Sequence, residues 1–90
     1  MSRAIENHHR SSAAMISRFA SDRCDTGAHL LGEATPLYRA YLDWCAETGH
    51  QPFKQTAFGW ALARSGFAAE KIGGRVYRRG VALRSAHSVV

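Results

Sequence analysis

Apolar residues recur at helical spacing in three segments of the chain, and this pattern predicts three helices. The first helix is expected over about residues 12–24, with Ser11 or Ser12 as its N-cap. The second is expected from Thr35 as N-cap and Pro36 at the first helical position to Gly49, and the third over about 54–65. The positions expected on their inner faces are Ala13, Ile16, Phe19, Ala20, Leu37, Tyr38, Tyr41, Leu42, Trp44, Cys45, Phe58, Ala61, Leu62 and Ser65.

The pattern changes after the third segment from helical spacing to short strands. Residues 67–72 and 75–79 flank Gly73-Gly74, a pair that supplies the positive φ angles of a two-residue hairpin turn. Neither face of this hairpin is consistently apolar, so it is expected to project into solvent. Beyond it, Val81 and Leu83 are expected to anchor the strand to the helices, and residues 28–34 form a short connection that can become a stub strand.

The order helix, short connection, helix, turn, helix, hairpin predicts an α+β fold. It is typical of a small winged helix-turn-helix domain, in which three helices are followed by a β-hairpin wing. The domain is expected to span residues 12–84, after a flexible leader over 1–11 and before a loose tail over 85–90. Ninety residues leave room for one such domain.

Charge divides the chain into two unlike parts. Residues 1–53 carry five Lys or Arg and six Asp or Glu, whereas residues 54–90 carry seven Lys or Arg and one acidic residue. The second part therefore has a net charge of +6, and the whole chain +5. A basic surface of this kind indicates a polyanionic partner, most commonly nucleic acid. The alternative is a basic surface that only aids solubility.

Residues 37–49 read LYRAYLDWCAETG. This segment and the Gly, Pro and apolar residues that follow it form a distinctive sequence pattern. The order resembles the winged-helix domain at the C-terminus of phage and plasmid primase-helicase proteins, the satellite-phage and poxvirus-type replication proteins. The resemblance covers roughly residues 12–84 and implies a domain that follows a helicase motor and contacts origin DNA. The later matched positions are Pro52, Phe58-Gly59, Leu62, Gly66-Phe67, Gly80-Val81 and Leu83.

The chain departs from this family in two respects. It has no P-loop and no primase residues, so no motor activity is expected, and we expect a detached terminal domain or a truncated prophage remnant. Family members often carry Ser or Thr as the cap of the third helix, where this chain has Lys54.

The fold, the charge and the resemblance together predict a non-catalytic DNA-binding module of a phage, plasmid or prophage replication protein. The third helix is expected in the major groove of double-stranded DNA and the basic hairpin on the phosphate backbone. A helicase or primase protein is a second expected partner. The candidate DNA-contacting residues are Lys54, Gln55, Thr56, Trp60, Arg64, Lys71, Arg75, Arg78 and Arg79.

Two residues of the third helix leave alternatives open. Trp60 points away from Phe58 and Leu62, so it either contacts DNA or a partner, or packs under the hairpin. Gly59 permits a close backbone approach either to DNA or to a neighbouring helix. The alternative function is a protein-interaction winged helix that docks on a helicase or another replication partner through Trp60 and the second helix.

No catalytic, cofactor-binding or metal site is expected. The histidines lie in the leader, loops and tail, so no catalytic triad can be assembled from them. Cys24 with His29 and Cys45 with His50 repeat one spacing, but the paired-cysteine knuckle of zinc sites is absent, and buried free thiols are expected instead. No stretch has the length of a membrane span or a signal peptide, so cytoplasmic localisation is expected. The sequence leaves the oligomeric state open.

Overall fold

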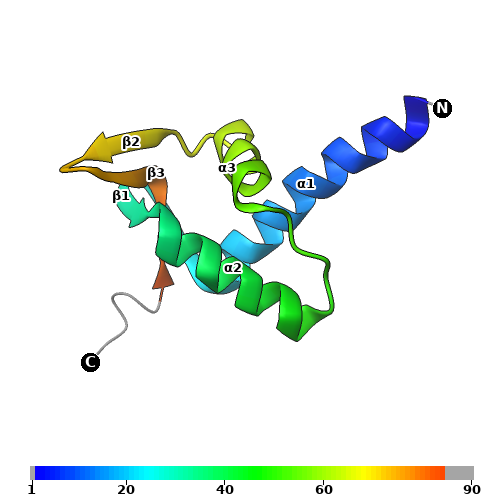
Figure 1. Cartoon of the computed structure of the whole chain (residues 1–90), viewed down its shortest axis with the longest axis horizontal. Coiled ribbons are helices and arrows are strands. Elements are labelled where there is room, and N and C mark those ends of the chain that lie inside the picture. The colour runs from blue at the N-terminus through cyan, green and yellow to red at the C-terminus, as the bar shows by residue number, and fades with distance from the viewer. Residues whose placement is uncertain (1, 85–90) are drawn as a thin grey trace.

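Three helices and three strands follow one another in the order α1-β1-α2-α3-β2-β3 (Figure 1). The computed structural model describes residues 2–84, so the expected tail lies outside the described residues. The helices and an antiparallel sheet make an α+β domain, in agreement with the expected class. The bounds are α1 Ser2–Arg23, β1 Cys24–Glu33, α2 Ala34–Thr48, α3 Gln55–Arg64, β2 Ala69–Ile72 and β3 Arg75–Leu83.

An aromatic cluster where the three helices meet forms the centre of the core. The rings of Tyr41 and Phe58 stack with their centroids 4.5 Å apart. Phe19 of α1 packs edge-on against Tyr41 and Trp44 of α2. The Tyr41 hydroxyl accepts a hydrogen bond of 3.0 Å from the backbone N–H of Phe53, which fixes the loop between α2 and α3. Of the fourteen residues expected on the inner helix faces, ten are buried. Tyr38 and Leu42 are half-buried, and the expectation is wrong for Ala13 and Ser65, which are exposed.

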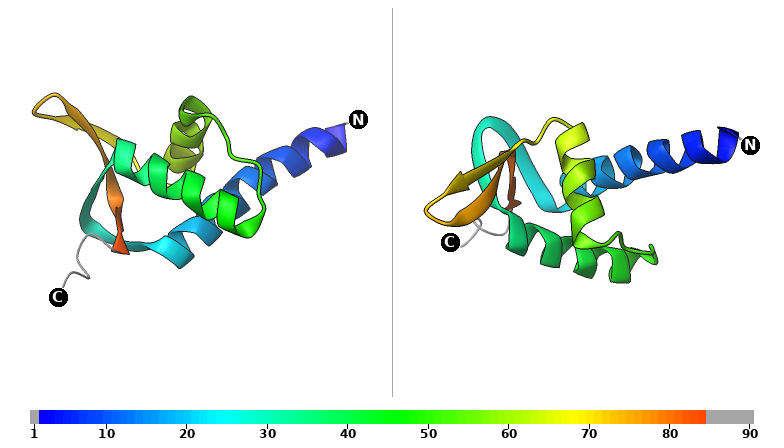
Figure 2. Two further views of the ribbon diagram at one scale, coloured as in Figure 1. Left: turned by 60° about the horizontal axis from the view of Figure 1, so that its bottom comes forward. Right: turned by 45° about the horizontal axis from the view of Figure 1, so that its top comes forward.

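The sheet has the strand order β1-β3-β2, and β2 and β3 form the expected hairpin. Gly73 and Gly74 have φ angles of 58° and 81°, the left-handed values that a two-residue hairpin turn requires. The hairpin extends away from the helices, and α3 lies between it and α1 (Figures 1 and 2). Val81 is buried and Leu83 packs against the core, so β3 is anchored as expected.

β1 joins the sheet by pairing with β3 rather than forming only a short connection. The register shifts between Thr26 and Leu31, so the pairing of β1 with β3 is irregular there. Beyond this irregularity, Gly32 lies directly against β3. A Cβ atom at this position would be 2.4 Å from the carbonyl oxygen of Val81 and 3.0 Å from Cα of Ala82. The two strands therefore approach each other more closely there than a side chain permits.

Two helix starts differ from the expectation. α1 begins at Ser2 instead of near residue 12, because neither Gly nor Pro interrupts the sequence up to Arg23. The segment expected as a flexible leader is thus helical. α2 begins at Ala34 with Glu33 as its N-cap, which places Pro36 in the first turn. Pro is tolerated there because the N–H groups of the first turn have no partner within the helix.

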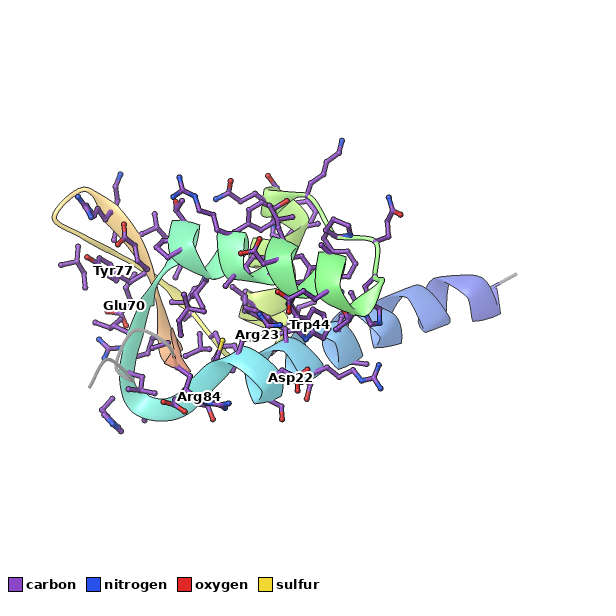
Figure 3. The ribbon with its side chains drawn as sticks, turned by 90° about the horizontal axis from the view of Figure 1, so that it is seen from below. Asp22, Arg23, Trp44, Glu70, Tyr77 and Arg84 are labelled. Carbon is purple, nitrogen blue, oxygen red and sulfur yellow. The ribbon has the colours of Figure 1, made fainter. Side chains whose placement is uncertain are left out.

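Arg84 ties the end of β3 to the end of α1. Its Nη2 donates hydrogen bonds of 2.7 and 3.0 Å to the carbonyl oxygens of Cys24 and Ser21, and its Nε donates to a carboxylate oxygen of Asp25 at 3.2 Å. Ser21 is in the last turn of α1 and Cys24 directly follows the helix, so Arg84 lies at the helix C-terminus, where a cation is electrostatically favoured. Arg84 lies beside this end of α1 in Figure 3.

Candidate nucleic-acid interface

α3 presents two distinct faces. Phe58, Ala61 and Leu62 point into the core, and Thr56 and Trp60 point to solvent. Trp60 is the most exposed large apolar residue described, with 66 % of its surface accessible. The expected division of the helix is therefore confirmed, and the alternative in which Trp60 packs under the hairpin is wrong.

The start of α3 has no side-chain cap. Lys54 occupies the N-cap position and makes no capping hydrogen bond. A lysine has no acceptor atom that could receive the N–H groups of the first turn. Those groups and the Lys54 ammonium therefore both favour a negatively charged ligand at this end of the helix. Gln55 and Thr56, which follow, are also exposed.

A groove of about 440 Å³ separates α3 from the hairpin. Phe58, Leu62 and Val76 contribute apolar surface to it, and polar side chains reach it from β1, α2, α3 and β3. The groove brings together three of the candidate residues, Gln55, Arg75 and Arg78. Its other lining residues are Glu33, Ala34, Thr35, Gly59 and Gly74.

Arg78 lies across α3 rather than extending from the hairpin. A Cβ atom at Gly59 would be 2.8 Å from Nη2 of Arg78, so the glycine provides the space for the guanidinium group. Nη1 donates a 3.2 Å hydrogen bond to the carbonyl oxygen of Phe67, and the buried Nε has no partner. Burial lowers the pKa of Arg78 from its ordinary value. The close approach at Gly59 is thus to an arginine of the hairpin and not to the backbone of a neighbouring helix.

Arg79 forms an ion pair within the hairpin. Its Nε and Nη2 donate to the two carboxylate oxygens of Glu70 at 2.5 and 3.0 Å. The guanidinium group holds the pKa of the Glu70 carboxyl below its ordinary value, and the carboxylate in turn raises the pKa of Arg79. The lowered carboxyl pKa keeps the pair ionised at neutral pH, and it is lost only as acid protonates Glu70.

Lys71 and Arg75 are the hairpin cations that extend furthest into solvent. Lys71 is exposed on β2, and 68 % of the Arg75 side chain is accessible. Nη1 of Arg75 donates a 3.3 Å hydrogen bond to a carboxylate oxygen of Glu33, an exposed ion pair of the kind that contributes little to stability. Arg64 lies exposed in the last turn of α3. The candidate cations therefore divide by exposure: Arg78 and Arg79 are half-buried, and the others are exposed.

Three residues that shape this surface were not among the candidates. Glu33 and Thr35 line the groove from the start of α2, and Glu70 holds Arg79. The ion pair between Glu70 and Arg79 could have been found from the sequence. Glu70 faces Tyr77 in the hairpin register, and Arg79 is two positions beyond Tyr77 on the same face of the hairpin. Glu70 and Tyr77 lie together in Figure 3. No local pattern places the start of α2 beside the hairpin.

The cysteines and the two described histidine side chains, His29 and His50, do not meet in a metal site. In the described part of the chain, no group of three or more His, Cys, Asp or Glu residues could hold a metal ion. Cys24 and Cys45 are buried free thiols, and the ring of His50 instead stacks on Trp44 with centroids 5.2 Å apart. His29 is exposed near Cys24. In the described residues, no helix is long and apolar enough to cross a membrane.

Both thiols are expected to be unreactive in the folded protein. Burial raises the pKa of Cys24 to about 12 and also raises the pKa of Cys45, so the reactive thiolate is scarce at pH 8. A chromogenic disulfide reagent is expected to release no colour from the native protein and the full signal from both thiols after denaturation. Rapid release from the native protein would show that a thiol is accessible.

A family model described as Poxvirus D5 protein-like matches residues 14–79, from the second half of α1 into β3. The chain belongs to the Poxvirus D5 protein-like family. The match includes all of α2, α3 and β2, and it confirms the expected relation to poxvirus-type replication proteins. This Poxvirus D5 protein-like chain is accordingly a replication-associated domain. Searches of the curated proteins and of the solved structures found no significant match.

Proposed function

We propose that this chain is a non-catalytic DNA-binding module of winged-helix architecture in a replication protein of the primase-helicase type. α3 is the helix that meets the bases and the β2–β3 hairpin is the wing. The observation that carries the proposal is the groove between α3 and the hairpin, which Gln55, Arg75 and Arg78 line together.

The arrangement of the elements supports this proposal. A helix pair is followed by a β-hairpin, and the first strand completes the sheet in the order β1-β3-β2. Winged-helix domains place the second helix of such a pair against DNA with the hairpin beside it. α3 lies next to the hairpin, and its outward face is open to solvent (Figure 2).

The groove suits a sugar-phosphate strand. In B-DNA one sugar-phosphate strand separates the major groove from the neighbouring minor groove. A helix in the major groove and a hairpin beside the minor groove must therefore leave a channel for this strand between the helix and the hairpin. Here the channel has an apolar floor that fits deoxyribose, and Arg75 and the uncapped start of α3 favour phosphate. The sequence from Lys54 onward carries seven cationic residues and one acidic residue, which supports a polyanionic partner.

Removal of the exposed hairpin cations tests the proposal. The Lys71→Ala/Arg75→Ala variant is expected to bind every duplex more weakly, because phosphates repeat identically along DNA. Two lost phosphate contacts should make the dependence of log affinity on log salt shallower by about two units. Fluorescence anisotropy at several salt concentrations measures this slope. Gln55→Ala should instead change the preference between duplexes, by about 1–3 kcal/mol at one base pair.

Arg18→Ala is the control for a general charge effect. Arg18 is exposed on α1 and does not line the groove, so its loss should leave the salt slope unchanged. Unchanged DNA binding in the double variant would contradict the proposal. That result would favour the alternative, in which the domain docks on a helicase or primase protein.

A further inference from the structure

The outward face of α3 changes its chemistry along the helix. Its start carries Lys54, Gln55 and Thr56, whose side chains can donate or accept hydrogen bonds. One turn later, about 6 Å along the axis, the outward positions are Trp60 and Ala63, with Gly59 at their edge. Between the first turn and Arg64 in the last turn, the indole N–H of Trp60 is the one side-chain hydrogen-bonding group on this face.

Trp60 stands clear of its neighbours on this second part. The neighbours three or four residues away are the small Thr56 and Ala63 and, at the edge of the outward face, Arg64. With these neighbours in place, 66 % of the Trp60 surface is still accessible. Its backbone neighbour Gly59 lies against the guanidinium group of Arg78. A bulky, exposed aromatic ring among small residues and beside cationic groups is the arrangement with which proteins stack unpaired nucleobases.

We propose that Trp60 stacks on an unpaired base, and that the DNA bound by this domain is a duplex with unpaired bases next to it. The first turn of α3 and the hairpin then bind the double-stranded part of the DNA, and the indole of Trp60 stacks on the first unpaired base next to it. The inference rests on the proposed function and makes it more specific. The basic half of the chain selects a nucleic acid as the occupant of this face instead of an apolar protein surface.

The physical reason for the preference is access to the base. In an intact duplex both faces of every internal base are covered by stacked neighbours, so an indole can reach only the base edges. An unpaired base exposes a face, and its stacking on an aromatic side chain strengthens binding by at least about fivefold. The preference does not depend on base identity, because every base has a flat π surface.

Three DNA molecules of one sequence test the inference. They are a blunt duplex, the same duplex with a single-stranded overhang, and the single strand alone. The full chain is expected to bind the overhang duplex about five to ten times more tightly than the blunt duplex. Trp60→Ala should reduce this ratio to near one, and Trp60→Phe should restore part of it. Ile72→Ala removes another exposed apolar side chain, from the hairpin, and should leave the ratio unchanged.

Tryptophan fluorescence gives a second readout. Trp44 is buried and Trp60 is exposed, so the overhang duplex should quench the emission of the parent protein but not of Trp60→Phe, in which only Trp44 remains. Equal affinity of the parent for the blunt and overhang duplexes would overturn the inference and leave the proposed function intact. A Trp60→Ala variant with an unchanged ratio would also overturn it. If the parent protein binds none of the three molecules, the proposed function itself fails.

Discussion

Trp44→Ala is expected to destabilise the domain by about 3–5 kcal/mol. Only 2 % of the Trp44 surface is accessible, and the ring packs against Phe19, Tyr41 and His50. Its indole Nε1 also donates a 2.9 Å hydrogen bond to a carboxylate oxygen of Asp22, which joins α2 to α1 (Figure 3). The truncation removes both the packing and this link. Since a domain of this size has a free energy of unfolding of only about 5–10 kcal/mol, much of its stability should be lost.

Thermal unfolding followed by circular dichroism measures this effect. A loss of 3 kcal/mol should lower the melting temperature by at least about 12 °C. Trp60→Ala is the matched control, because it makes the same chemical change at an exposed position and should alter stability by at most about 0.5 kcal/mol. A Trp44→Ala protein that melts like the parent would show that the aromatic cluster is not the centre of the core.

Gly32→Ala is expected to disturb the pairing of β1 with β3. The added methyl group would meet the carbonyl oxygen of Val81 at 2.4 Å and the Cα atom of Ala82 at 3.0 Å. Both are backbone atoms, so they cannot move without displacing the strand. Overpacking of this kind costs about 1–3 kcal/mol, and denaturant titration should show a lower free energy of unfolding.

Gly27→Ala is the control within the same strand. A Cβ atom at Gly27 would lie 3.2 Å from a ring carbon of His29, a side chain that is exposed and can turn away. Little loss of stability is therefore expected. Equal losses in the two variants would mean that the flexibility of glycine, and not the close approach of β1 to β3, explains the sequence at Gly32.

The elements that were predicted well carry their own signal in the sequence. The broad apolar stripe of α2 and the Gly73-Gly74 turn each fix a local conformation, and both were located correctly. β1 has no such signal. Its residues make a strand only because β3 pairs with them, and the shift of register between Thr26 and Leu31 interrupts any alternation of apolar and polar positions.

The candidate interface was predicted to the level of elements but not of single contacts. The sequence located the basic residues of the hairpin, and the hairpin register already placed Glu70 within reach of Arg79. It gave no indication that Arg78 folds back over Gly59, because that contact depends on how closely the hairpin approaches α3. The local sequence pattern specifies whether a segment forms a helix or a strand, whereas tertiary packing decides which of its side chains remain exposed for binding.

The bond network of Arg84 has a mechanical consequence. Cys24 and Leu83 are opposite each other at one end of the β1–β3 ladder, so a load applied across residues 23 and 84 would peel the two strands apart one pair at a time. Peeling needs less force than shearing all the pairs at once. Arg84 holds the carbonyl oxygens of Ser21 and Cys24 at the point where peeling would begin. The hydrogen bonds of Arg84 must therefore break before the first pair of the β1–β3 ladder can separate.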